Sequence, residues 1–323
     1  MSTATAPAPT RDRTPWFRPS PGAFPARRDA SPVSSASATT SDDVHLSHSQ
    51  CRTYAGCSLQ WFLSRRYQPE FVPANLAFGA SFHAALDAYY QARLEGRDAT
   101  LADLLAAYAT HWADEIAGKH SHTPTPTPIP VKFTGKEEDE AGMQALAERM
   151  LTAFLEYQRQ RVSEVIALEE SFRIDIADDL PPLVGRVDLV EIVTGDDGKR
   201  TLCLVDFKTA ARKPSLEDLG ADQLLLYGKA AVGMGLVSAF QLPLSLRYLV
   251  VTKIKRPEVH IVEVENVPWE WSRLAEKIRQ CWRGMEAGIA YPSPSWRCSG
   301  CGHARLCGQW PTLKAAPSLA ASA

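Results

Sequence analysis

The stretch LVGRVDLVEIVTGDDGKRTLCLVDFK, residues 183–208, has the pattern of a β-hairpin. Two runs rich in Val and Leu flank TGDDGK at residues 194–199, a segment whose glycines and aspartates are typical of a tight turn. Apolar side chains occupy neighbouring as well as alternate positions in both runs, so both strands are expected to be buried on much of both faces. The hairpin therefore predicts the centre of a sheet.

Charged side chains interrupt these apolar runs, and three of them matter most: Asp188, Asp206 and Lys208. Asp206 and Lys208 are two residues apart, so they project from the same face of their strand. If the hairpin is symmetric about Asp197, Asp188 lies opposite Asp206. The plainest interpretation of Asp-x-Lys is a solvated ion pair that contributes little to stability. Charges between buried strands, however, need a partner or a metal ion.

This arrangement suits the hydrolysis of a phosphodiester. Two close carboxylates repel each other unless a cation lies between them, and their oxygens favour Mg²⁺ or Mn²⁺ over zinc. A lysine beside such an ion can hold or deprotonate an attacking water. The hairpin thus predicts a metal-dependent hydrolytic site.

The spacing of apolar residues predicts the elements around the hairpin. Helices are expected at residues 76–94, 100–117, 138–162, 215–235 and 268–287, after a short helix that begins with a capping box at Ser47-x-x-Gln50. Strands are expected at 165–176, 183–193, 201–208, 244–251 and 259–264. One face of the first strand is expected to carry Ile166, Leu168, Phe172, Ile174 and Ile176. Helices around a small central sheet predict an α/β fold.

Composition limits the class of protein. The 323 residues include 35 Lys+Arg and 37 Asp+Glu, a formal net charge of −2. This balance excludes a protein that coats nucleic acid through bulk positive charge. There is no run of 18 apolar residues, so no membrane span is expected. No apolar leader is recognisable, so a cytoplasmic location is expected, although five Arg in residues 1–44 leave organelle targeting open.

Two terminal segments are expected to be disordered. Ser, Thr, Ala and Pro make up 28 of residues 1–44, too few apolar side chains to offset the cost of ordering the chain. Residues 313–323 have a similar composition. The folded domain is therefore expected at 45–312, with the Pro- and Thr-rich stretch 120–130 as a loop between helices.

Three cysteines near the C-terminus, Cys298, Cys301 and Cys307, have the spacing of ligands to a metal ion or an iron–sulfur cluster. A fourth ligand is needed. His303 would complete a local zinc site, and Cys57 would complete a four-cysteine site from a distant part of the chain. Cys203 and Cys281 lie among apolar residues and are interpreted as small core side chains.

Several motifs in a fixed order resemble those of the PD-(D/E)xK nuclease superfamily. They are GRVD at 185–188, LVDFKT at 204–209 and QLLLY at 223–227. The branch that looks most similar comprises the RecB-like and CRISPR-associated exonucleases with an iron–sulfur cluster. The resemblance runs from about Leu46 to Trp310. It implies a restriction-endonuclease-like core, a helical insertion at about 98–163 and a Cys-rich knuckle at 290–310.

The resemblance also implies roles for single residues. Asp188 and Asp206 match the catalytic carboxylates, Lys208 matches the catalytic lysine, and Gln223 and Tyr227 match side chains that line the active site. Gly79-Ala-Ser-Phe-His83 is similar to the Gly-x-x-x-His motif, whose histidine binds metal. The implied ligands of Mg²⁺ or Mn²⁺ are His83, Asp188, Asp206 and the backbone carbonyl of Phe207. Glu169 resembles a supporting glutamate of the family, with Glu170 as the alternative.

The segment 46–57 resembles the family's N-terminal Ser-x-Ser…Tyr-x-x-Cys pattern, which places Cys57 among the ligands and Cys51 at an apolar helix position. The resemblance therefore implies a [4Fe–4S] cluster on Cys57, Cys298, Cys301 and Cys307. Its role would be structural, and zinc is the lesser alternative.

The implied function is a metal-dependent DNA exonuclease that acts at single-stranded or frayed ends. DNA repair, recombination and the processing of CRISPR or phage DNA would be its settings, with partner proteins, in bacteria or phages. Alternatives are a non-catalytic DNA-binding or assembly subunit and a structure-specific or restriction-type endonuclease. Local basic groups, such as Arg212, Lys213, Arg247 and Lys253, and aromatic side chains such as Trp61, Phe62, Tyr248 and Trp282, are candidate DNA contacts.

Overall fold

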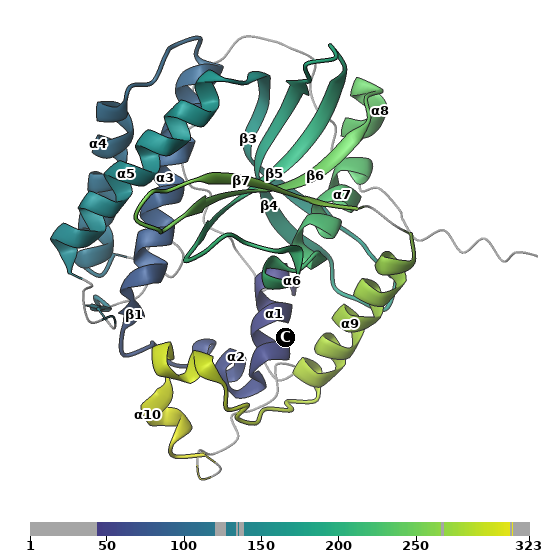
Figure 1. The fold of residues 1–323 in the computed structure, drawn as a ribbon. Coiled ribbons are helices and arrows are strands. Elements are labelled where there is room, and N and C mark those ends of the chain that lie inside the picture. The colour runs from purple at the N-terminus through teal and green to yellow at the C-terminus, as the bar shows by residue number, and fades with distance from the viewer. Residues whose placement is uncertain are drawn as a thin grey trace, which may run out of the picture.

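A five-stranded mixed sheet lies at the centre of the computed structural model, which describes residues 44–119, 127–133, 135, 139–265, 268–310 and 312. The strand order is β3-β4-β5-β6-β7, with β5 and β6 parallel and the other neighbours antiparallel (Figure 1). The strands are β3 Val162–Ile174, β4 Leu183–Thr194, β5 Arg200–Ala210, β6 Leu244–Thr252 and β7 Val259–Val264. Apart from Val44, the two expected tails lie outside the described residues, as do residues 120–126 of the Pro- and Thr-rich stretch.

The register of the β4–β5 hairpin is the one that the symmetric turn predicts. Thr194 pairs with Arg200, and the ladder continues to Leu189 opposite Val205. The turn closes with a hydrogen bond of 2.9 Å from the Gly195 amide to the Lys199 carbonyl. The next positions beyond the last pair are Asp188 and Asp206, so the prediction that they lie opposite each other is confirmed.

Two layers of helices cover the sheet (Figure 1). One face packs on α3 Ala74–Leu94, α4 Leu101–Ile116 and α5 Glu140–Arg159. The other packs on α1 His48–Gly56, α7 Asp222–Gly233 and α9 Pro268–Glu286. Strand β5 contributes side chains to the apolar cores on both faces of the sheet. Val205 and Phe207 pack in the core beneath α3, α4 and α5, and Leu202 and Leu204 pack in the core beneath α1, α7 and α9. The predicted α/β class, a small mixed sheet flanked by helices, is confirmed.

Smaller elements complete the chain. They are α2 Ser58–Ser64, the parallel pair β1 Val72–Pro73 and β2 Val131–Lys132, α6 Leu216–Leu219, α8 Leu236–Phe240, the 3₁₀ turn η1 Trp296–Gly300, and α10 Ala304–Cys307. The expected insertion at about 98–163 contains α4, β2 and α5. Among the described helices, none is long and apolar enough to cross a membrane.

The first helix joins the two ends of the described chain. Ser47 caps α1 by accepting a hydrogen bond of 3.2 Å from the Gln50 amide, as predicted. On its inner side, the Cys281 thiol of α9 lies 3.8 Å from the Cys51 carbonyl, and both cysteines are buried. The Tyr54 hydroxyl donates to the Ile289 carbonyl just after α9, at 2.9 Å. The described N-terminal segment is thus packed against the last long helix.

The prediction of a single helix at 215–235 is wrong in one respect, because the segment contains two helices, α6 and α7. Gly220 separates them with φ of 78°, a left-handed conformation that ends α6. Ser215 caps α6, whereas α7 begins at Asp222 without a side-chain cap. The break brings the first turn of α7 beside the ends of β5 and β6.

The predicted face of β3 is also wrong in part. Phe172, Ile174 and Ile166 pack in the same cluster, but Leu168 packs on the opposite side of the sheet. The register with β4 shifts between Val165 and Ala167, and Glu169 has φ of 52°. Each irregularity reverses the alternation of side chains, because the period of a strand is two. A left-handed glutamate costs about 1–2 kcal/mol, which is typical of positions under functional constraint.

A buried ion pair links α5 to the sheet. Arg161 Nη2 lies 2.7 Å from Glu191 Oε1, and the Glu191 side chain is 1% exposed. Arg161 also donates to Gln158, whose amide donates to the Tyr90 hydroxyl at 2.7 Å. The network satisfies polar groups that burial would otherwise leave without partners.

We expect Arg161→Met to lower the free energy of unfolding by about 3–5 kcal/mol, because it leaves the Glu191 carboxylate buried and uncompensated. Urea unfolding followed by circular dichroism measures this loss. The double variant Arg161→Met/Glu191→Leu is expected to lose less. The matched control is Arg200→Met, which removes an exposed pair with Glu164 and is expected to cost at most about 1 kcal/mol. Equal losses in Arg161→Met and Arg200→Met would contradict the prediction.

Candidate active site

The Asp206 carboxylate is the centre of a hydrogen-bonded cluster at the end of the hairpin. Its side chain is 1% exposed. Oδ1 accepts from Gln223 Nε2 at 2.5 Å and from the Tyr227 hydroxyl at 3.0 Å. Oδ2 forms an ion pair with Lys208 Nζ, which also donates to Gln223 Oε1 at 3.2 Å. The structure thus brings together four of the five predicted catalytic side chains.

Tyr227 acts in this cluster as a hydrogen-bond donor. Burial, together with the negative charge of Asp206, raises the pKa of the Tyr227 phenol far above its ordinary value. The hydroxyl therefore stays protonated and donates to Asp206. The same hydroxyl accepts from Gln223 Nε2 at 3.0 Å, so the two side chains, one helical turn apart on α7, hold each other in place.

Asp188, the fifth side chain, faces the cluster from β4. Its Oδ2 accepts from the Phe207 amide at 2.8 Å and lies 3.7 Å from Nδ1 of His83 on α3. Burial and the negative charge of Asp206 raise the pKa of Asp188 well above its usual range. The His83 ring packs edge-on against Phe207, with 5.8 Å between the ring centroids. The predicted residues His83, Asp188 and Phe207 are therefore adjacent.

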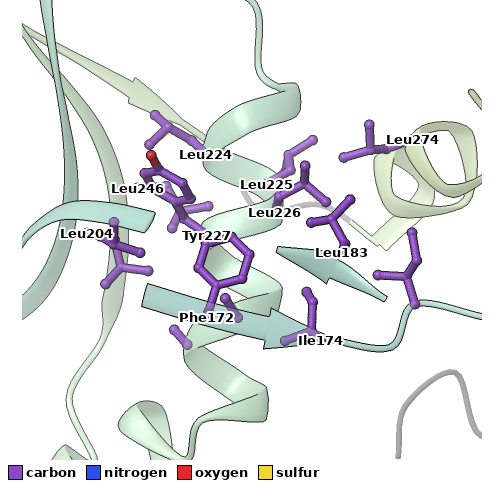
Figure 2. Close-up of a cluster of buried hydrophobic side chains, with 14 of the residues drawn as sticks. Phe172, Ile174, Leu183, Leu204, Leu224, Leu225, Leu226, Tyr227, Leu246 and Leu274 are labelled. Atoms are coloured by element: carbon purple, nitrogen blue, oxygen red, sulfur yellow. The ribbon is translucent and has the colours of Figure 1, made fainter. Parts of the chain in front are cut away.

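A missing side chain at Gly185 helps to position Tyr227. Gly185 lies opposite Phe172 in the β3–β4 ladder, and a Cβ atom there would collide with the Phe172 ring. That ring lies edge-on to Tyr227, with 6.0 Å between centroids. Figure 2 shows Tyr227 and Phe172 together among leucines of α7 and the sheet. The glycine of the GRVD motif thus permits the packing beneath the phenol.

Asp87 is a site residue that the sequence analysis missed. It lies one turn after His83 on α3. Burial and the negative charge of Glu169 raise the pKa of Asp87 to about 7, and Arg186, which pairs with Glu169 at 3.0 Å, opposes this shift. Asp87 in turn contributes to the raised pKa of Asp188. The i, i+4 spacing from His83 was the available signal. Of the two alternatives, Glu169 is the glutamate whose charge reaches Asp87.

In the described part of the chain, no three His, Cys, Asp or Glu side chains converge on a point that could hold a metal ion. Both oxygens of Asp206 face Lys208, Gln223 and Tyr227 instead. The donor set nevertheless fits a hard divalent cation. Among the described residues, Asp206 Oδ2 has no hydrogen-bond partner beyond its ion pair, and the charges of Asp188 and Asp206 oppose each other. His83 lies beside Asp188 as a further donor.

The cysteines of the knuckle lie near Cys57. Burial raises the pKa of Cys301 and of Cys307, and the nearby thiols of Cys57 and Cys298 raise both further. The Cys57 thiol lies 3.9 Å from the carbonyl of Tyr291, at the start of the knuckle. Negatively charged thiolates this close to one another would repel. A positively charged metal centre bound by them would offset that repulsion.

His303, the alternative fourth ligand, is buried, and its Nδ1 lacks a hydrogen-bond partner among the described atoms. A buried imidazole nitrogen without a partner has the chemistry of a zinc ligand, so His303 stays the alternative fourth ligand. Among the described residues neither ligand set converges on one point, so the four-cysteine site and the site with His303 both stay predictions.

The prediction that Trp61 and Tyr248 stack on bases is wrong. Trp61 is 5% exposed and Tyr248 is 1% exposed, so neither ring offers a surface for a base. Arg65 lies over the Trp61 ring, with its guanidinium carbon 4.7 Å from the centroid, and Lys208 Nζ lies 5.8 Å from the Tyr248 centroid. Trp61 lies on α2 and Tyr248 on β6, and in both cases the neighbouring elements cover the ring.

Comparison with family models gives a match to the PD-(D/E)XK nuclease superfamily over residues 45–308. Among solved structures, the chain is similar to that of a "Putative exonuclease" from Eubacterium rectale, with 15% identity, a TM-score of 0.40, and 86% of this chain and 92% of that chain covered. It is also similar to the structure of SSO0001, with 13% identity, a TM-score of 0.30, and 80% and 93% covered. No curated protein matches the chain.

We expect Asp87→Asn to stabilise the metal-free protein increasingly as pH rises. The carboxyl pKa is about 7 in the folded state, against about 4 in an unfolded chain. Folded wild-type protein therefore loses stability between pH 4 and pH 7, where Asp87 must become charged while buried. The variant avoids this loss, so its advantage grows over that interval to on the order of 4 kcal/mol.

Thermal melts in EDTA across this pH range measure the difference. Asp114→Asn on α4 is the control, because it removes an exposed carboxyl group. Parallel pH profiles for wild type and Asp87→Asn would contradict the expected effect.

Proposed function

Because the chain belongs to the PD-(D/E)XK nuclease superfamily, we propose that it is a metal-dependent DNA exonuclease that hydrolyses phosphodiester bonds at single-stranded or frayed ends. The observation that carries the proposal is the cluster of Asp188, Asp206 and Lys208, all three present on one buried hairpin. A non-catalytic subunit would have no need to keep two opposed carboxylates and a lysine in the middle of a core.

His83, Asp188, Asp206 and the carbonyl of Phe207 would hold the cation, with Glu169 supporting the site through Asp87. When bound, Mg²⁺ or Mn²⁺ would supply positive charge to the scissile phosphate and to the attacking oxygen. The other functions fall to side chains of the cluster. Gln223 and Tyr227 fix the Asp206 carboxylate by hydrogen bonds to Oδ1, and Oδ2, which pairs with Lys208, is the oxygen that would bind the cation.

Lys208 has the role of positioning the attacking water. Its ammonium group is held between Asp206 Oδ2 and Gln223 Oε1 and can donate a further hydrogen bond. A water held by this group is aligned for attack, and the positive charge of Lys208 stabilises the negative charge that develops on the phosphate oxygens. The lysine is 27% exposed, so a substrate can reach it.

We expect Lys208→Ala and Asp206→Asn to lower the cleavage of an end-labelled single-stranded oligonucleotide in Mn²⁺ at least about 100-fold. Lys199→Ala in the β4–β5 turn is the matched control and should retain wild-type activity, since Lys199 pairs with Asp197 in solvent. Undiminished cleavage in the two site variants would refute the assignment of the site.

Circular single-stranded DNA is expected to resist the enzyme, because an exonuclease needs an end. Cleavage of the circle would identify an endonuclease instead. DNA binding without cleavage in either Mg²⁺ or Mn²⁺ would favour the non-catalytic subunit. We place the activity in DNA repair, recombination or the processing of CRISPR or phage DNA, alongside partner proteins, in the cytoplasm of a bacterium or in a phage-infected cell.

We also propose a [4Fe–4S] cluster on Cys57, Cys298, Cys301 and Cys307. The proximity of Cys57 to the knuckle supports it, as do the hydrogen bonds between residues 58–59 and Tyr291 that already connect the two segments. Such a site would pin α1 and α2 to the C-terminal end and stabilise the folded state against opening of that end.

Protein purified anaerobically is expected to be brown, with an absorption band near about 400 nm and about four iron atoms per chain. Cys57→Ser should lose the colour, whereas Cys203→Ala, which changes a core cysteine of β5, should keep it. A colourless protein with zinc would instead identify the site that includes His303.

A further inference from the structure

A cavity of about 580 Å³ lies beside the active site, between α1, the start of α7, α9 and the knuckle. Its wall includes side chains from all four segments, namely His48, Arg52, Asp222, Arg273, Lys277 and Arg297. The volume is within the range of sites that hold small ligands or single nucleotides. None of these residues belongs to the catalytic cluster.

Gly220 and Tyr248 connect the cavity wall to the catalytic cluster by direct contacts. Gly220 lines the cavity, and its carbonyl accepts a hydrogen bond of 3.0 Å from the Tyr248 hydroxyl. The ring of Tyr248 lies beneath Lys208 Nζ at 5.8 Å. Asp222, on the cavity wall, directly precedes Gln223 of the catalytic cluster. The cavity wall thus adjoins two residues that contact Lys208, namely Tyr248 and Gln223.

The wall has both signs of charge, and part of the negative charge is already engaged. Asp222 pairs with Lys277 at 2.5 Å, and Asp218 pairs with Arg212 at 2.9 Å. Three arginines, Arg52, Arg273 and Arg297, and two glutamates, Glu217 and Glu270, also line the cavity.

The first turn of α7 adds positive electrostatic potential to the cavity wall. Gly220, Ala221 and Asp222 line the cavity, and Ala221 caps the helix without a side-chain hydrogen bond. The positive end of the helix dipole therefore faces the cavity. Burial and the positive charge of Arg52 lower the pKa of His48 to about 4. At neutral pH this imidazole is uncharged and can donate or accept a hydrogen bond.

An exposed aromatic side chain stands at the rim. Trp296 is 82% exposed, and the guanidinium carbon of Arg297, which lines the cavity, lies 5.5 Å from its ring centroid. Tyr291, 54% exposed, belongs to the same segment. A tryptophan held by an arginine at the mouth of a charged cavity provides a stacking surface next to a phosphate-binding group.

We propose that this cavity, with Trp296 at its rim, binds the nucleotides of a single strand that flank the scissile bond. The inference rests on the proposed nuclease function and assigns the substrate contacts that it leaves open. The mixed wall suits a nucleotide better than a bare anion, because the arginines take the phosphate while the glutamates accept from amino groups at a base edge. Trp296 stacks on the next base along the strand.

The experiment compares two substrates of different length in the full-length enzyme. Bis(p-nitrophenyl) phosphate reaches the catalytic cluster alone, whereas a single-stranded oligonucleotide also spans the cavity. We expect Arg52→Ala and Trp296→Ala to lower kcat/KM for the oligonucleotide about tenfold or more relative to the small ester, mainly through KM. Arg52→Ala should also reduce the salt dependence of oligonucleotide binding by about one unit of slope.

Arg149→Ala is the matched control, because Arg149 is exposed on α5, on the opposite side of the sheet, and it should leave both substrates unchanged. A variant that changes the two substrates in equal proportion, or neither, would overturn the inference. If wild-type protein cleaves neither substrate, the proposed function fails. Fluorescence anisotropy of a labelled oligonucleotide in EDTA then still decides the inference, since binding weakened by Arg52→Ala and Trp296→Ala supports it and unchanged binding overturns it.

Discussion

A carboxylate buried in the middle of a sheet has to be compensated, and the compensation of Asp206 organises this protein. Its side chain is 1% exposed, yet it accepts from Gln223 and Tyr227 and faces the ammonium group of Lys208. Each partner comes from an element whose place depends on the others. Strand β5 must extend beyond its pairing with β4, and α7 must begin beside it, which the break at Gly220 allows. The cost of burying one charge is thereby spread over the hairpin and the helix that crosses it.

Local sequence pattern predicted the features that depend on short-range rules. The turn around Asp197 determined the hairpin register, and the register determined that Asp188 and Asp206 face each other. The resemblance to the nuclease family, and not the local pattern, pointed to Gln223 and Tyr227, which lie one turn apart on α7 and both donate to Asp206. Asp188, Asp206 and Lys208 could be identified from the pattern because the strand period is rigid and the hairpin is short.

The features that the pattern missed depend on contacts between distant segments. The bulge near Ile166 and the left-handed Glu169 arise where β3 must pass Asp188 and Arg186, which no local period records. Asp87 could be identified only from the structure, in which α3 packs against the hairpin and Glu169 lies near Asp87. Burial of Trp61 and Tyr248, and exposure of Trp296, likewise follow from which helices cover which surface. Cysteine spacing predicted a cluster of ligands, and the fold added the proximity of Cys57 to the knuckle.

The contact of α1 with α9 has a consequence for the order in which the chain can fold. Cys51 and Tyr54 contact residues more than 200 positions later, so α1 has no tertiary partner on α9 until most of the chain has been synthesised. The β3–β4–β5 meander pairs neighbours in sequence and can form earlier, with α3–α5 already available to cover one of its faces. The other face, together with Asp206, would then stay exposed to water until α7 and then α9 have been synthesised. The nascent chain therefore carries a half-covered sheet until late in its synthesis, and the last long helix to emerge, α9, is the one that covers the other face.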